Sequence, residues 1–163
     1  MRHVISILME NESGALSRVA GLFSARGYNI ESMSVAPTDD PTLSRMTLVT
    51  RGTDDIVEQI IKQLNKLIDV VKLLDLKEHP HIERELMLVK AQVDDERGAR
   101  VKHLADIFGA RIIDVTSMAY TVELCGSSNK LNSFLDALKT IPLLEVVRSG
   151  SMGIARGDIS LKL

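Results

Sequence analysis

The hexapeptide NESGAL, which begins at Asn11, carries residue types that could hold a small carboxylate ligand. We expect Ser13 to be the N-cap of a helix. The N–H groups of Gly14, Ala15 and Leu16 would then be among those without a helical acceptor, at the positive end of the helix dipole. Glycine lets a ligand approach the backbone closely, and the Asn11 amide offers a donor and an acceptor. This arrangement suits an amino acid, although an ordinary capped helix explains the same residues equally well.

The other reactive residues do not form a catalytic constellation. The motifs GxSxG, GxxxxGK[ST], GxGxxG and HExxH do not occur, and Ser13 has no neighbouring histidine that could activate it. His79 and His81 could form a two-histidine metal site, but Pro80 and the shortage of further ligands favour a solvated linker. Cys125 is expected to be a small core hydrophobe rather than a nucleophile. We therefore expect no catalytic residue and no metal or cofactor site in this chain.

Hydrophobic periodicity predicts the elements that position these residues. In the first half it predicts the order strand, helix, strand, strand, helix, strand, with the apolar patterns at residues 4–9, 16–23, 29–36, 43–51, 57–64 and 67–76. Gly27 follows the first helix, where a left-handed cap is easiest for glycine, and Thr53 suits the start of the second. The order βαββαβ predicts a four-stranded antiparallel sheet with two helices on one face.

The second half repeats the pattern of the first. Shifting residues 19–33 by 85 positions, onto residues 104–118, gives six identities in fifteen. Further strand and helix patterns complete a second βαββαβ order, at residues 85–93, 101–108, 120–125, 131–138 and 143–148. The fold class is therefore α+β, with two consecutive ferredoxin-like domains. We place the first domain at residues 1–77, a polar hinge at 78–82 and the second domain at 83–163.

Composition restricts the function classes further. Hydrophobic residues make up 45% of the chain and aromatic residues 3%, which predicts an aliphatic core with few platforms for base stacking. The 20 basic and 22 acidic residues leave a formal charge of −2, which argues against a nucleic-acid-binding surface. No apolar run approaches the length of a membrane span, and a single cysteine suits a reducing compartment. We expect a cytoplasmic protein that binds neither nucleic acid nor membrane.

The stretch ENESGALSRVAGLFSARGYNIESMSVAPTDDPTLSRMTLV closely resembles the ACT domain of the small, regulatory subunits of acetolactate synthase, also called acetohydroxyacid synthase. The resemblance continues through ERELMLVK, IIDVT, YTVEL and EVVRSGSMGIARG, so it covers nearly the whole chain. It implies a non-catalytic partner that activates a large catalytic subunit and confers feedback inhibition by a branched-chain amino acid, usually valine. Thiamine diphosphate, magnesium and FAD are then expected on the large subunit.

The resemblance also implies where the effector binds. In the family, the site lies between two ACT domains that pair through their second strands. Asn11 and the backbone of Gly14, Ala15 and Leu16 in one protomer would hold the amino-acid head group. Asn29 and Ile30 of the partner would complete the pocket, which implies a homodimer.

Two other functions remain open at this point. The chain could be an amino-acid-sensing module of a different enzyme or of a transcription regulator, although no helix-turn-helix accompanies the repeats. It could also be an enzyme, although no acid, base or nucleophile constellation supports this. The sequence leaves undetermined the preferred effector among valine, leucine and isoleucine, the stoichiometry with the large subunit, and the residues that contact it.

Overall fold

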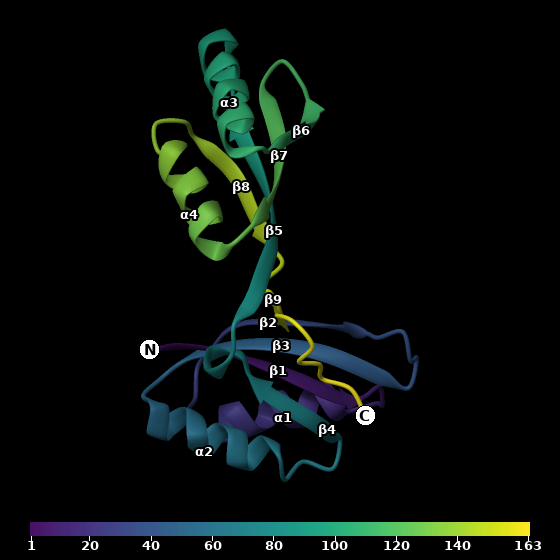
Figure 1. The fold of residues 1–163 in the computed structure, drawn as a ribbon. Coiled ribbons are helices and arrows are strands. Elements are labelled where there is room, and N and C mark those ends of the chain that lie inside the picture. Colours follow the sequence, from purple (N-terminus) through teal and green to yellow (C-terminus); the bar gives the residue numbers. More distant parts are fainter. The chain divides into compact units, whose positions relative to one another are not determined.

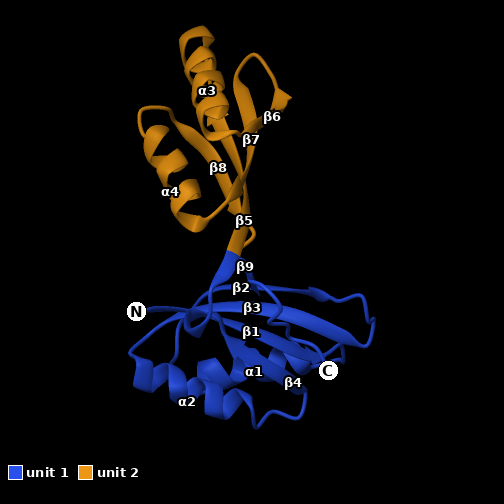
Figure 2. Cartoon of the chain, viewed as in Figure 1, with its two compact units in different colours: residues 1–82, 151–163 blue, residues 83–150 orange.

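The computed structural model describes residues 1–163 and divides them into two compact units. Unit 1 contains Met1–Ile82 and Ser151–Leu163, and unit 2 contains Glu83–Gly150 (Figure 2). Each unit contains the order βαββαβ that the sequence predicts, so the α+β class with two ferredoxin-like repeats is confirmed. None of the helices is long and apolar enough to span a lipid bilayer.

Unit 1 is built on a four-stranded antiparallel sheet with strand order β2-β3-β1-β4. Its elements are β1 (Arg2–Glu10), α1 (Ala15–Ala25), β2 (Ile30–Pro37), β3 (Leu43–Arg51), α2 (Asp54–Leu64), β4 (Val70–Asp75) and a 3₁₀ turn η1 (Leu76–Glu78) (Figure 1). Thr53 caps α2, because its side chain accepts a hydrogen bond from the Ile56 N–H. Strand β4 begins later than the apolar pattern suggested, since residues 67–69 form a turn in which Val70 N–H donates to the Leu67 carbonyl.

The two faces of the first sheet are covered by different parts of the chain. One face packs against α1 and α2 around a core of aliphatic residues and Phe23. The opposite face carries Leu8 and Leu43, which pack with Leu161 from the end of the chain. Residues 151–163, including β9 (Met152–Ala155), therefore lie against the face that the helices leave open.

This return of the chain differs from the domain boundaries that the sequence suggested. We expected residues 83–163 to form the second domain, whereas residues 151–163 belong to unit 1. The attachment is specific: Gly153 N–H donates to Thr47 Oγ1 at 3.1 Å, and Arg45 Nη2 donates to the Gly153 carbonyl at 3.3 Å. The physical reason is that the face left uncovered by the helices carries apolar side chains, among them Val4, Leu8 and Val49, which residues 151–163 help to bury.

Unit 2 repeats the architecture with strand order β6-β7-β5-β8. Its elements are β5 (His81–Gln92), which begins in unit 1, α3 (Asp95–Phe108), β6 (Arg111–Val115), β7 (Ala119–Gly126), α4 (Ser128–Ala137) and β8 (Leu143–Arg148). Asp94 and Ser127 cap the two helices with side-chain hydrogen bonds to Arg97 N–H and Lys130 N–H. The core is aliphatic apart from an edge-to-face pair of Phe108 and Phe134.

The prediction for Cys125 is wrong, because its side chain is exposed. Side chains alternate along a strand, and Leu124 of β7 points into the core at 1% exposure. The next residue must therefore face outward. Its cross-strand partner Leu86 is likewise 42% exposed on the same face.

Candidate functional site

The loop between β1 and α1 has an unusual helix start. The N-cap is Gly14, with φ 85° and ψ −9°, and no side chain caps the helix. The expectation that Ser13 caps it is therefore wrong. Ala15 N–H donates to the Glu12 carbonyl at 3.3 Å, which places Gly14 at the third position of a tight turn. That position of a type II turn requires a positive φ, which glycine adopts without strain.

The turn changes which backbone donors are available. Ala15 N–H is engaged by Glu12, and the Ala15 side chain is buried in the core at 2% exposure. No group of the chain accepts a hydrogen bond from the N–H of Gly14, Leu16 or Ser17. These three N–H groups therefore remain free at the positive end of α1, which has no acidic side chain in its first turn.

Asn11 ties this loop to the hairpin between β2 and β3. Its backbone N–H donates to the Thr42 carbonyl at 2.8 Å, and its Nδ2 donates to the Pro41 carbonyl at 3.0 Å. The Oδ1 atom makes no hydrogen bond within the chain. Asn11 can therefore accept a hydrogen bond from an ammonium group while its position is fixed by the hairpin.

Arg18, in the first turn of α1, is a charged residue that the sequence did not single out. Its guanidinium group pairs with Asp69, with Nη2 to Oδ1 at 2.9 Å and Nε to Oδ2 at 2.5 Å. Asp69 is 4% exposed, and the hydrogen bond from Arg18 lowers the pKa of that carboxyl below its usual value. The two residues are 51 positions apart, so the sequence does not reveal that they pair. The one local signal is the i, i+4 spacing, which places Arg18 beside Gly14 on the surface of a helix.

The structure does not bring the two halves of the predicted site together within one chain. Asn11 contacts Thr42, just before β3 begins, whereas the Asn29 carbonyl accepts from Thr50 Oγ1 at 2.6 Å near the end of that strand. Strand β3 contains nine residues, and strands rise about 3.3 Å per residue, so the two ends are separated by roughly 25 Å. Asn29 is exposed and Ile30 is half-buried at the edge of the sheet.

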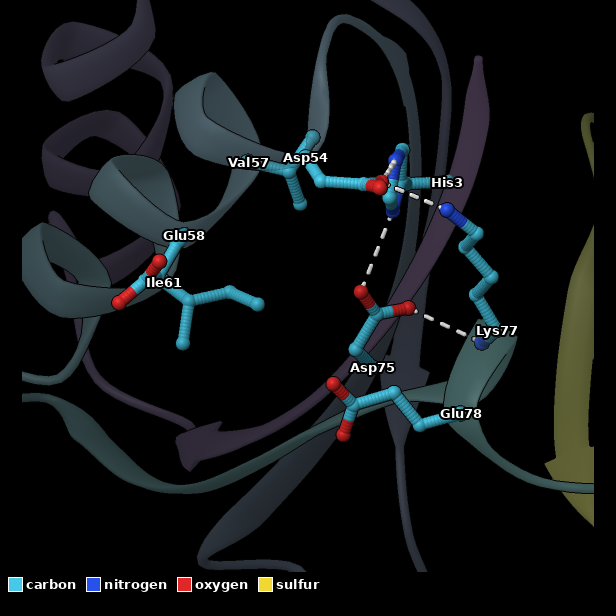
Figure 3. Close-up of a pocket in the computed structure, with 8 residues that line it drawn as sticks. All are labelled: His3, Asp54, Val57, Glu58, Ile61, Asp75, Lys77 and Glu78. Atoms are coloured by element: carbon cyan, nitrogen blue, oxygen red, sulfur yellow. Dashed lines mark hydrogen bonds and ion pairs between the residues drawn. The ribbon is translucent and has the colours of Figure 1, made fainter.

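A separate pocket of about 360 Å³ lies between α2 and the end of β4 (Figure 3). His3 is its most buried polar residue, with Nδ1 at 3.2 Å from Asp75 Oδ2 and Nε2 at 3.2 Å from Asp54 Oδ1. Lys77 Nζ donates to Asp54 Oδ1 at 2.6 Å and lowers the pKa of that carboxyl. The cluster joins β1, α2, β4 and η1, and within it the buried His3 Nε2 makes no hydrogen bond. None of the predicted effector residues lines this pocket.

No group of three or more histidine, cysteine or acidic side chains is arranged to hold a metal ion. In the hinge, His81 Nδ1 lies 2.8 Å from the His79 carbonyl oxygen, a local backbone contact.

The βαββαβ order and the strand order β2-β3-β1-β4 of unit 1 define an ACT-type fold. The sequence of residues 5–72 matches the model of the "AHAS small subunit-like ACT domain", and residues 84–157 match the model of the "Small subunit of acetolactate synthase". The chain belongs to the family of acetolactate synthase small subunits.

Individual relatives agree over nearly the whole length. The chain is 56% identical to the acetolactate synthase isozyme 3 small subunit of Salmonella typhimurium, over 97% of this chain and 98% of the relative. It is 54% identical to the acetolactate synthase small subunit of Haemophilus influenzae, with the same coverage. The crystal structure of the small subunit from Thermotoga maritima superposes with a TM-score of 0.87 at 34% identity, covering 98% of this chain and 99% of that one.

Proposed function

We propose that this protein is the regulatory subunit of an acetolactate synthase, and that it binds a branched-chain amino acid, with valine as the first candidate. In this function the chain activates the large catalytic subunit and makes it sensitive to feedback inhibition. Catalysis and its cofactors, thiamine diphosphate, magnesium and FAD, then belong to the large subunit. The observation that carries the proposal is family membership over both units, with an open helix start at the position the family uses.

The arrangement of unit 1 supports a site shared by two copies. Strand β2 lies at the edge of the sheet and runs antiparallel to β3. If the β2 strands of two copies pair antiparallel, the Ile30 end of one strand lies beside the Pro37 end of the other. Pro37 is opposite Ser44, at the same end of the sheet as Asn11. The pairing would thus bring Asn29 and Ile30 of one copy to the helix start of the other.

The edge itself is suited to such pairing. Strand β2 has no lysine, and its one proline is its last residue, so little prevents another strand from adding to it. Val35 is 40% exposed on this strand. The effector would then be bound only by the dimer, with the head group at α1 of one protomer.

Valine calorimetry with the purified full-length chain tests this site. We expect the wild-type protein to bind valine, and Asn11→Ala to weaken binding by about tenfold or more, because one charge-assisted hydrogen bond contributes roughly 1.5–3 kcal/mol. The matched control is Asn129→Ala, at an exposed position of α4 in unit 2, and this variant should bind valine as the wild type does. Equal affinity in the wild type and Asn11→Ala would refute the site, and the absence of binding for valine, leucine and isoleucine would refute the sensing function.

A further inference from the structure

The side chain of Arg18 reaches back over the start of its own helix. Side chains on a helix tilt toward its N-terminus, so a residue at i+4 lies above residue i. The guanidinium group accordingly lies against Gly14: a Cβ atom added to that glycine would be 2.9 Å from Arg18 Nη1. The absence of a side chain at Gly14 therefore makes room for a positive charge at the helix start.

Asp69 fixes the orientation of this charge. It binds Nε and Nη2 of the guanidinium fork, and its carboxylate is 4% exposed next to β1, where the Asp69 carbonyl accepts from Glu10 N–H at 2.8 Å. A guanidinium held through two of its nitrogens loses most of its rotational freedom. The position of the third nitrogen, Nη1, is thus set before any ligand arrives.

The third nitrogen has no acceptor within the chain. Nη1 takes part in no hydrogen bond or ion pair, and the Arg18 side chain is 48% exposed. The neighbouring N–H groups of Leu16 and Ser17 are also free. Helices α2 and α3 carry acidic residues in their first turns, whereas α1 has none, so no acidic side chain of its own first turn neutralises the positive end of α1.

We infer that Arg18 binds the carboxylate of the amino-acid effector through Nη1, and that Asp69 is the positioning residue that aims it. This inference rests on the proposed function, because it deepens the effector site at the start of α1. Although it is paired with Asp69, Arg18 adds a guanidinium donor whose charge-assisted hydrogen bond the backbone N–H groups cannot make, and this favours ligands with a free carboxylate. A valine derivative with an uncharged amide in that place loses the charge-assisted part of the interaction with Arg18.

The test compares valine with valinamide, in which an uncharged amide replaces the carboxylate. Binding to the full-length chain is measured by calorimetry, or by NMR titration where affinity is low. For Arg18→Gln we expect at least a tenfold loss of valine affinity and no more than a twofold change for valinamide. Arg18→Lys keeps the positive charge but lacks the planar guanidinium group, so its valine affinity should lie between those of the wild type and Arg18→Gln. Arg26→Gln, at the other end of α1, is the matched control and should bind both ligands normally.

Each outcome decides the inference. Unchanged valine affinity in Arg18→Gln would overturn it while leaving the proposed effector site intact. An equal loss for valine and valinamide would also overturn it, because it would show that Arg18 acts only on the structure of the loop. If Arg18→Gln fails to fold, the same comparison in Arg18→Lys decides. If the wild type binds none of the branched-chain amino acids, the proposed function fails and this inference fails with it.

Discussion

At the scale of single residues, the start of α1 depends on the backbone conformation of Gly14. The periodicity of the sequence predicts a helix here, and the position of the site near Asn11 and Gly14 follows from residue types alone. The positive φ of Gly14 does not follow from residue types, because glycine adopts positive and negative φ and the sequence does not reveal the sign at this position. The same limit explains why Ser13 was expected to cap the helix.

We predict that Gly14→Ala destabilises unit 1 by about 1–2 kcal/mol, the cost of a left-handed conformation for a residue with a Cβ atom. The added methyl group would also press against Arg18 Nη1. Gly21→Ala is the matched control within the same helix, where no heavy atom lies within 4 Å of the new Cβ. It should stabilise by about 0.5–1 kcal/mol. Chemical denaturation measures both changes, and equal effects of the two substitutions would contradict the account.

Glu85 gives unit 2 a dependence on pH. It is 5% exposed, and Arg148 donates to it from Nε at 2.8 Å and from Nη2 at 2.9 Å. These hydrogen bonds lower the pKa of Glu85 below its usual value. Because the folded state has the lower pKa, the carboxylate stabilises the fold above the unfolded pKa of about 4.3, and this contribution is lost as the pH falls through the folded pKa.

We therefore predict that wild-type stability falls more steeply than that of Glu85→Gln as the pH drops from about 5 to 3. The glutamine variant should be less stable at pH 7, because it leaves Arg148 without its charged partner. Glu123→Gln is the control, since Glu123 makes no ion pair. Parallel pH profiles of unfolding for the wild type and Glu85→Gln would argue against the assigned role of the pair.

At the scale of elements, sequence patterns predicted the helices and most strands, because periods of 3.6 and 2 follow from local geometry. Cys125 could have been placed correctly by the same alternation. The return of residues 151–163 to unit 1 could not be predicted in this way. Strand β9 has only four residues, and its apolar side chains do not indicate which sheet the strand joins. The pairing of Arg18 with Asp69 could not be predicted either, because the two residues lie far apart in the chain and no local pattern links them.

The C-terminal segment should contribute to the stability of unit 1 through Leu161. This side chain is 7% exposed and packs with Leu8 and Leu43. Replacing it with alanine should cost about 1.5–3 kcal/mol, the value of burying a leucine side chain. Leu163→Ala, two residues later, should have no measurable effect, because Leu163 is 86% exposed. Thermal unfolding of both variants tests the prediction, and it is wrong if they lower the melting temperature equally.

At the scale of the whole molecule, the account requires two copies joined at β2. We expect the wild type to be a dimer at micromolar concentration, and Val35→Lys, which places a charge on this edge, to be a monomer. Val115→Lys is the matched control: it makes the same change at 59% exposed Val115 on β6, an edge strand of unit 2. Sedimentation equilibrium separates the two variants. If Val115→Lys dissociated and Val35→Lys did not, the dimer contact would lie elsewhere than at β2.

The most direct test of the central claim is acetolactate formation by the large catalytic subunit, measured with and without this chain and with and without valine. The account predicts no turnover of pyruvate by the chain alone, a higher rate when the chain is added to the large subunit, and inhibition by valine only in the mixture. Asn11→Ala should retain the activation and lose much of the inhibition. A large subunit whose rate and valine response are unchanged by adding the chain would contradict the account.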